Sequence, residues 1–128
     1  MNPLKQTILV CDDNRDSSEL LKFAFNLEGF EVVIGDDLDR CLDEAVRKNF
    51  QAIILDNRFG DLSSIDVSRH IRRIDPNVPI IFYSGEARSS EIEKALSAGA
   101  NAYLIKPLDF EKLTDTVIDL IKKTGAES

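Results

Sequence analysis

Residues 7–13 read TILVCDD, a continuously apolar run that ends in two carboxylates, and this stretch decides the fold. The same pattern returns at residues 52–56, which read AIILD. Residues 79–84 read PIIFYS and residues 102–107 read AYLIKP, so two more apolar runs end in a hydroxyl and an ammonium group. Continuous apolar runs of this length are typical of parallel strands that are covered on both faces of a sheet.

Helical patterns separate these runs. Apolar residues recur at helical spacing after each strand, and Gly29 and Gly99 are the stops expected at helix ends. A fifth strand is expected at residues 30–34. The expected helices cover five ranges: from a cap at Asp16 or Ser17 to about residue 28, then 38–48, 63–74, 89–98 and 110–123.

Particular apolar side chains are expected in the core. In the first helix, Leu20, Ala24 and Leu27 repeat at i, i+4 and i+7 and predict the buried face, together with the pair Phe23 and Phe25. In the final helix, Leu113, Val117, Leu120 and Ile121 form a similar stripe that should pack on the sheet.

Five strands that alternate with five helices predict an α/β fold. Right-handed crossovers give a (βα)5, doubly wound, five-stranded parallel sheet, and the flavodoxin-like strand order is 2-1-3-4-5. That order places the first and third strands side by side. Because ligands bind outside the carboxyl ends of such strands, Asp12, Asp13 and Asp56 are expected to meet there with Ser84 and Lys106.

Length and charge limit the classes of function. The 128 residues fit one domain, 1–128, with a core of about 7–123. The net charge of −7 and the lack of a basic stripe argue against direct nucleic-acid binding. No apolar stretch is long enough to span a membrane, and the N-terminus lacks a signal-peptide pattern, so a cytoplasmic protein is expected. Cys11 and Cys41 lack metal-ligand spacing and are expected to be small buried residues.

The expected constellation has a coherent chemistry. Clustered carboxylates require a cation, and Mg²⁺ prefers such hard oxygen ligands and binds together with phosphate oxygens. An aspartate can itself be the nucleophile and form an aspartyl-phosphate. Lys106 can neutralise phosphoryl oxygens, and the hydroxyl of Ser84 can donate a hydrogen bond to one.

Each of these motifs has an ordinary structural explanation when taken alone. Asp12-Asp13 could cap a helix, and Asp56, Ser84 and Lys106-Pro107 could be turn residues. The joint occurrence of all four after expected strands favours a functional site. The single histidine, His70, lies beside three arginines in an expected helix and is interpreted as part of a solvated face.

With these spacings, Asp12-Asp13, Asp56, Ser84 and Lys106-Pro107 resemble the receiver domain of two-component response regulators, the CheY-like family. The resemblance covers about residues 7–123. It implies that Asp56 accepts a phosphoryl group from a histidine kinase or histidine phosphotransfer protein in signal transduction. It also implies that Asp12, Asp13, Asp56 and the carbonyl of Arg58 hold Mg²⁺.

The resemblance assigns further roles. The Lys106–Pro107 bond would be cis, and Ser84 and Tyr103 would form the switch that responds to phosphate. Arg58 and Glu86 would tune the phosphoryl lifetime, and we expect them to pair across the pocket mouth. Such a domain is not an enzyme beyond its own phosphorylation and dephosphorylation. Its last two helices and last strand would control a partner or output domain, with a phosphorylation-dependent homodimer as a further option.

The chain departs from the family pattern after the acceptor. It has Phe59-Gly60 where the family often has Met-Pro, and Ser64 where a glycine is common. Gly60 lacks the fixed φ of proline and is expected to loosen the loop that carries Arg58.

Two other functions stay open at this point. A phosphatase of the haloacid-dehalogenase kind also uses aspartate, lysine and Mg²⁺, but its nucleophile would follow the first strand in an Asp-x-Asp pattern, where this chain has Asp12-Asp13-Asn14. A degenerate receiver would act only as a protein-binding module. Turnover of a generic phosphate ester would favour the phosphatase, and failure to take up phosphate with Mg²⁺ would favour the module.

Overall fold

A computed structural model describes residues 6–59 and 62–125. Its central element is a five-stranded parallel sheet with the order β2-β1-β3-β6-β7, which confirms the predicted topology. The strands are β1 (Thr7–Cys11), β2 (Glu31–Gly35), β3 (Ala52–Leu55), β6 (Ile80–Ser84) and β7 (Ala102–Ile105). The three runs predicted to be central, β1, β3 and β6, are the inner strands.

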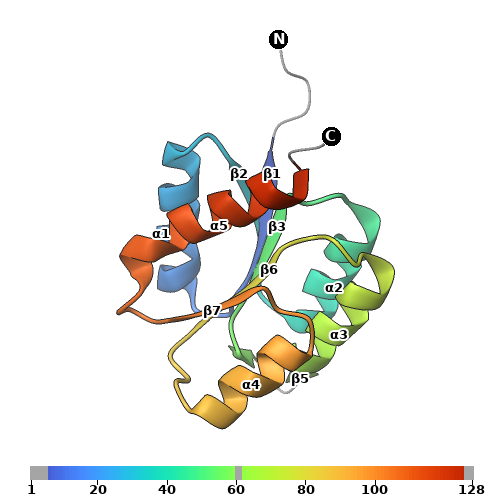
Figure 1. Cartoon of the computed structure of the whole chain (residues 1–128). Helices are drawn as coiled ribbons and strands as arrows, with labels where there is room; N and C mark the ends of the chain where they lie inside the picture. The colour runs from blue at the N-terminus through green and yellow to red at the C-terminus, as the bar shows by residue number, and fades with distance from the viewer. Residues whose placement is uncertain (1–5, 60–61, 126–128) are drawn as a thin grey trace.

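Helices cover both faces of this sheet (Figure 1). One face carries α1 (Arg15–Leu27) and α5 (Phe110–Gly125), and the other carries α2 (Leu38–Arg47), α3 (Ser64–Ile74) and α4 (Ser89–Ser97). Each face has its own apolar core, because alternate side chains of the strands point to opposite faces. In the described residues, no helix is both long enough and apolar enough to cross a membrane.

The predicted buried face of α1 is confirmed for Phe25 and wrong for Leu20, Phe23 and Leu27. Leu20, Phe23 and Leu27 are 51%, 63% and 70% exposed, whereas Leu21 and Phe25 are buried. Both sets satisfy helical spacing, so periodicity alone could not choose between them. The ring of Phe25 packs edge-on against Phe30 with the centroids 6.0 Å apart, and this contact settles which face turns inward.

The helix ends follow capping chemistry, with one correction. The N-cap of α1 is Asn14, whose side chain accepts a hydrogen bond from the Ser17 amide at 2.8 Å, and not Asp16 or Ser17. Ser63 caps α3 as predicted. Gly29 and Gly99 follow α1 and α4 with φ of +92° and +105°, a backbone region that favours glycine.

The segment after Asp56, which the sequence suggests is a loop carrying Arg58, contains regular structure. Its described residues form two short antiparallel strands, β4 (Arg58–Phe59) and β5 (Leu62–Ser63). Gly60 lies outside the described residues, so its expected loosening of this loop stays a prediction.

The final helix, α5, follows its predicted pattern. Leu113, Val117 and Ile121 of α5 are buried, and Leu120 packs against the same core. The short helix α4 buries only Ala95 and leaves Leu96 44% exposed. Few apolar anchors therefore hold α4 to the sheet.

Candidate functional site

Three of the predicted site residues meet at the carboxyl edge of the sheet. Asp12 follows β1, Asp56 follows β3 and Lys106 follows β7. The Lys106 Nζ donates to Asp12 Oδ2 at 2.6 Å and to Asp56 Oδ2 at 3.1 Å. One ammonium group from residue 106 thus joins two carboxylates that lie 44 positions apart in the sequence and sit on adjacent strands.

The bridge is largely withdrawn from water. Lys106 is 20% exposed, Asp12 is 3% exposed and Asp56 is 12% exposed. Burial alone would lower the pKa of Lys106, but its hydrogen bonds and charge interactions with Asp12 and Asp56 outweigh that effect and raise it. Lys106 therefore remains a fixed positive charge, placed where phosphoryl oxygens would arrive at Asp56.

Hydrogen bonds hold the Asp12 carboxylate and the Asp56 backbone in place. The Asn14 amide donates to Asp12 Oδ1 at 2.9 Å, so Asp12 is held on both oxygens. The buried hydroxyl of Ser64 donates to the backbone carbonyl of Asp56, and the Asp56 amide donates to the carbonyl of Cys11 at 3.0 Å. Sequence analysis noted Ser64 only as a departure from the family pattern and missed this contact, since nothing local indicates it.

Ser84 ends β6 near Asp56 and is 1% exposed. Its Oγ accepts a hydrogen bond from the Glu86 amide at 3.1 Å. The Tyr103 hydroxyl donates to the carbonyl of Glu86 at 2.7 Å and accepts from the Asn57 side-chain amide at 3.3 Å. These bonds connect the segment after Asp56, the β6–α4 loop and β7.

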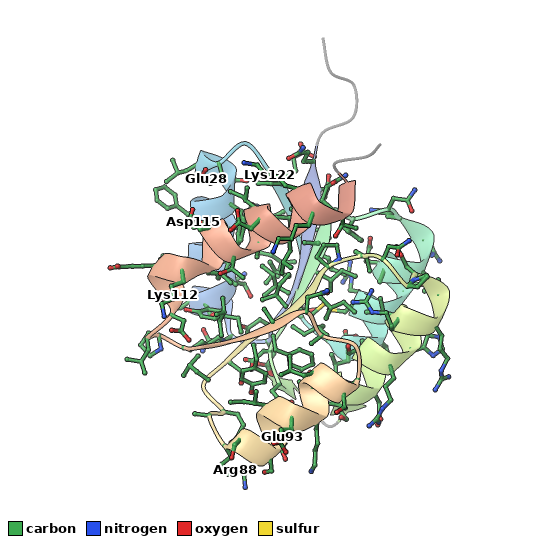
Figure 2. The ribbon with its side chains drawn as sticks, in the orientation of Figure 1. Glu28, Arg88, Glu93, Lys112, Asp115 and Lys122 are labelled. Atoms are coloured by element: carbon green, nitrogen blue, oxygen red, sulfur yellow. The ribbon has the colours of Figure 1, made fainter. Side chains whose placement is uncertain are left out.

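Glu86 forms a two-pronged ion pair with Arg88, with N···O distances of 2.8 and 3.1 Å. Figure 2 labels Arg88 at the start of α4. The Glu86 side chain is 8% exposed, and Arg88 is 68% exposed. The side chain of Arg58 lies outside the described residues, so the expected pair of Arg58 with Glu86 stays a prediction. The Lys106–Pro107 peptide bond is cis.

The donor set suits a hard cation. Asp12 and Asp56 present carboxylate oxygens, and Asp13 lies exposed beside them, which is the ligand chemistry of Mg²⁺. Among the described residues, no three acidic, histidine or cysteine side chains are gathered as a cation cage.

The surface is hollowed on both sides of the bridge. Asp56, Ser84, Gly85 and Glu86 line an open hollow of about 370 Å³. Asp12, Asp13, Arg15 and Arg40 contribute to a second hollow of about 380 Å³. Asp56, although only 12% exposed, therefore borders a hollow that opens to solvent.

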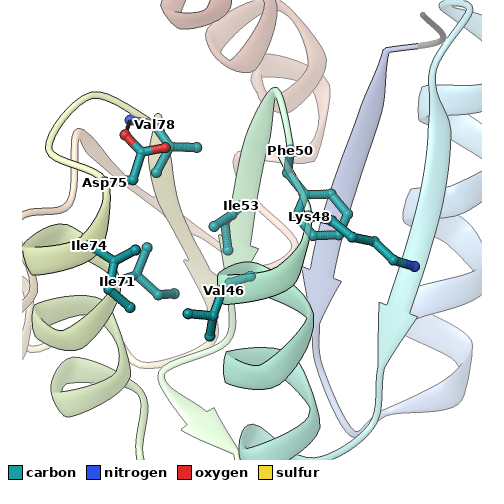
Figure 3. A pocket seen from close by; sticks show the side chains of 9 residues that line it. Val46, Lys48, Phe50, Ile53, Ile71, Ile74, Asp75 and Val78 are labelled. Atoms are coloured by element: carbon teal, nitrogen blue, oxygen red, sulfur yellow. Dashed lines mark hydrogen bonds between the residues drawn. The ribbon is translucent and has the colours of Figure 1, made fainter.

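An apolar hollow lies at the opposite, amino edge of the sheet, between α2 and α3 (Figure 3). Phe50, Ile53, Ile71 and Val78 line it, and Val46 lies at its edge and is 48% exposed. Its enclosed space of about 10 Å³ is the room of roughly one water molecule. It holds none of the candidate site residues.

Alkaline pH is expected to destabilise the fold. Burial raises the pKa of Cys11, Tyr83 and Tyr103, and the pKa of Lys106 is also raised. The folded chain then holds protons that the unfolded chain releases above about pH 8.5 for cysteine and about pH 10 for tyrosine and lysine. This stabilisation is complete below those values and is lost as pH rises through the folded pKa values.

Urea unfolding at about pH 7, 9 and 10 checks this prediction, and the midpoint should fall at each step. A Cys11→Ala control should show a smaller fall between the first two values. A midpoint that does not change between pH 7 and 10 would contradict the assignment.

Comparison with known proteins gives concordant matches. The family described as "Response regulator receiver domain" matches residues 8–118. The transcriptional regulatory protein ZraR of Salmonella typhimurium is 30% identical over 126 residues, covering 96% of this chain and 29% of that protein. The uncharacterised transcriptional regulatory protein YrkP of Bacillus subtilis is 36% identical over 118 residues, covering 91% and 49%. The chain thus spans about half or less of these curated relatives.

Solved structures agree with the fold. A receiver domain protein from Methanospirillum hungatei superposes with a TM-score of 0.91 at 22% identity, covering 98% of this chain and all of that one. The receiver domain of the sensor histidine kinase PA1611 from Pseudomonas aeruginosa has a TM-score of 0.83 at 28% identity and covers 92% and 98%. That structure has a magnesium ion coordinated in the active-site cleft.

Proposed function

Because the chain belongs to the response regulator receiver domain family, we propose that Asp56 accepts a phosphoryl group from a histidine kinase or histidine phosphotransfer protein. The observation that carries this proposal is the Lys106 bridge to Asp12 and Asp56 at an open edge of the sheet. It provides a carboxylate nucleophile with a fixed cation beside it, and phosphoryl transfer needs little else from a protein.

In the proposed transfer, one bond to phosphorus forms and one breaks. An Asp56 carboxylate oxygen attacks phosphorus, an acyl-phosphate bond forms, and the phosphorus–nitrogen bond of the donor histidine breaks. Lys106 neutralises charge on the phosphoryl oxygens, and the Ser84 hydroxyl turns from the Glu86 amide to donate to one of them. Asp12, Asp13, Asp56 and the Arg58 carbonyl would hold Mg²⁺, which supplies further neutralisation. Hydrolysis of the acyl-phosphate bond by water restores the Asp56 carboxylate.

Exposed apolar residues on the helix that starts at the site, and on the loop after Lys106, support a protein donor. Leu20, Phe23 and Leu27 form a solvent-facing stripe on α1, which starts directly after the acidic pair. Leu108, two residues after Lys106, is 82% exposed. We infer that a docking donor protein covers this apolar surface, since apolar and aromatic anchors dominate such contacts.

The output face would be α4, β7 and α5. Phosphate at Asp56 adds charge and strong acceptor oxygens that compete for Ser84 and Lys106. Tyr103 of β7 and the start of α4 are hydrogen-bonded to the segment that carries Ser84. A shift of order 1–3 kcal/mol at this face would control a partner protein, an attached output domain or a second copy of the chain.

The test is intact-mass analysis after incubation with a small acyl-phosphate donor, with and without Mg²⁺. The proposal expects a phosphoryl adduct that needs Mg²⁺, survives acid and is lost in base. A folded chain that forms no adduct would instead be a phosphorylation-independent binding module, and turnover of a generic phosphate ester would indicate a phosphatase.

Glu86 and Arg58 are expected to slow dephosphorylation. Glu86 holds Arg88 at the pocket mouth, and the expected approach of Arg58 would further restrict attacking water. Glu86→Ala and Arg58→Ala should each speed phosphate loss by roughly two- to fivefold, the equivalent of one exposed ion pair. Loss is followed by intact mass over time after donor removal, with Glu93→Ala as the control. Unchanged rates in both variants would reject this role.

A further inference from the structure

Asn57, the residue directly after the proposed acceptor, contacts Tyr103 across the sheet edge. The Asn57 side-chain amide donates to the Tyr103 hydroxyl at 3.3 Å, and the two residues are 46 positions apart. Both side chains are half-buried. Sequence analysis singled out Tyr103 but not Asn57, because no local pattern indicates this contact.

The Tyr103 hydroxyl is held from two sides. It accepts from Asn57 and donates to the Glu86 carbonyl at 2.7 Å. Its ring stacks on Phe82 with centroids 5.7 Å apart and planes 8° apart. Stacking fixes the ring plane, and the two hydrogen bonds hold the hydroxyl beside the acceptor segment, near Ser84.

We propose that Asn57 is a positioning residue that holds Tyr103 inward before any phosphate is present. The relay runs from Asn57 through the Tyr103 hydroxyl and the Glu86 backbone to Ser84 Oγ, the hydroxyl proposed to respond to phosphate. The effect of this relay on signalling rests on the proposed function. The inward position of Tyr103 in the unphosphorylated chain does not depend on that function.

Removing the amide should release the ring. In Asn57→Leu, the Tyr103 hydroxyl keeps its acceptor at Glu86 but loses its donor, and a half-buried hydroxyl with fewer partners gains from reaching water. The ratio of inward to outward ring positions should fall roughly three- to tenfold, the loss typical of one hydrogen bond.

Fluorine NMR of the chain labelled with 3-fluorotyrosine measures this directly. The chain has two tyrosines. Tyr83 is 4% exposed and packs in the core on the opposite face, so it is an internal reference. Tyr103→Phe assigns the signals. Asn57→Leu should move or broaden the Tyr103 signal toward that of a solvated ring and leave the Tyr83 signal in place.

A double-mutant cycle separates positioning from a general structural effect. Asn57→Leu should lower the urea midpoint in the Tyr103 background and leave it nearly unchanged in the Tyr103→Phe background. Equal losses in both backgrounds, or a Tyr103 signal that Asn57→Leu does not move, would overturn the proposal.

Both measurements use the unphosphorylated chain, so they stand even if Asp56 proves not to accept phosphate. If it does, acyl phosphate with Mg²⁺ should shift the Tyr103 signal of Asn57→Leu more than that of the wild type, whose ring is already inward. An equal shift of the Tyr103 signal in the two proteins would show that Asn57 has no part in the switch.

Discussion

Asp56→Asn is expected to abolish phosphoryl uptake from an acyl-phosphate donor. The amide removes the nucleophilic carboxylate and changes the side-chain volume very little. Lys106 keeps its bond to Asp12 at 2.6 Å, and the Asp56 backbone keeps its bonds to Ser64 and Cys11, so the site should stay assembled. The expected loss is therefore a loss of chemistry, not of fold.

Intact-mass analysis of the wild type and the variant under the same conditions checks this expectation. Asp119→Asn, an exposed position on α5, is the matched control because it makes the same change in charge. It should take up phosphate like the wild type. An adduct that forms on Asp56→Asn at the wild-type level would show that another residue is the acceptor.

Lys106→Met is expected to lower the free energy of unfolding by about 3 kcal/mol at neutral pH without divalent cations, the low end of the range for breaking a buried ion pair. Methionine keeps an unbranched side chain that is one heavy atom shorter, and it removes the charge. Asp12 and Asp56 would then lie 3% and 12% exposed, without the ammonium group that neutralises both. The low end applies because Lys106 is itself 20% exposed.

Urea denaturation of the wild type and three variants tests this. Lys112→Met removes a lysine that is 73% exposed and pairs with Asp109 at 3.6 Å, so it should cost less than about 1 kcal/mol. The double variant Asp12→Asn, Lys106→Met should recover most of the loss, because only one carboxylate remains in the site. A Lys106→Met protein as stable as the wild type would contradict the electrostatic description of the site.

The sheet could be predicted from sequence because its signal is local. Each apolar run is bounded by turn residues, and the rules for crossovers and strand order then place Asp12, Asp56 and Lys106 at one edge. The structure brings these three side chains together as ion-paired neighbours. Their proposed roles in phosphoryl transfer are the part that experiments must now decide.

Contacts that depend on tertiary packing could not be predicted. In α1, Leu20 and Leu27 fit helical spacing as well as Leu21 and Phe25 do, and only the packing of Phe25 against Phe30 distinguishes them. The bond from Ser64 to the Asp56 carbonyl and the approach of Asn57 to Tyr103 join segments whose proximity appears only after folding.

Arg72 is a further example of a contact that the sequence conceals. It appeared to be one of several solvated arginines beside His70. In the structure its guanidinium group donates to the carbonyls of Gly99 and Val78 at 2.7 Å each, and so ties the end of α4 to the start of β6. The end of α4 is therefore anchored by polar bonds, while its start is held by the Glu86–Arg88 pair.

The most direct test of the central claim is to locate the phosphoryl group on the wild-type chain. Borohydride reduction after incubation with acyl phosphate and Mg²⁺ converts an aspartyl-phosphate to homoserine, and peptide mass spectrometry then finds the changed residue. We expect homoserine at position 56 alone, and none without the donor. Homoserine at position 12 or 13, with Asp56 unchanged, would contradict the assignment of the acceptor.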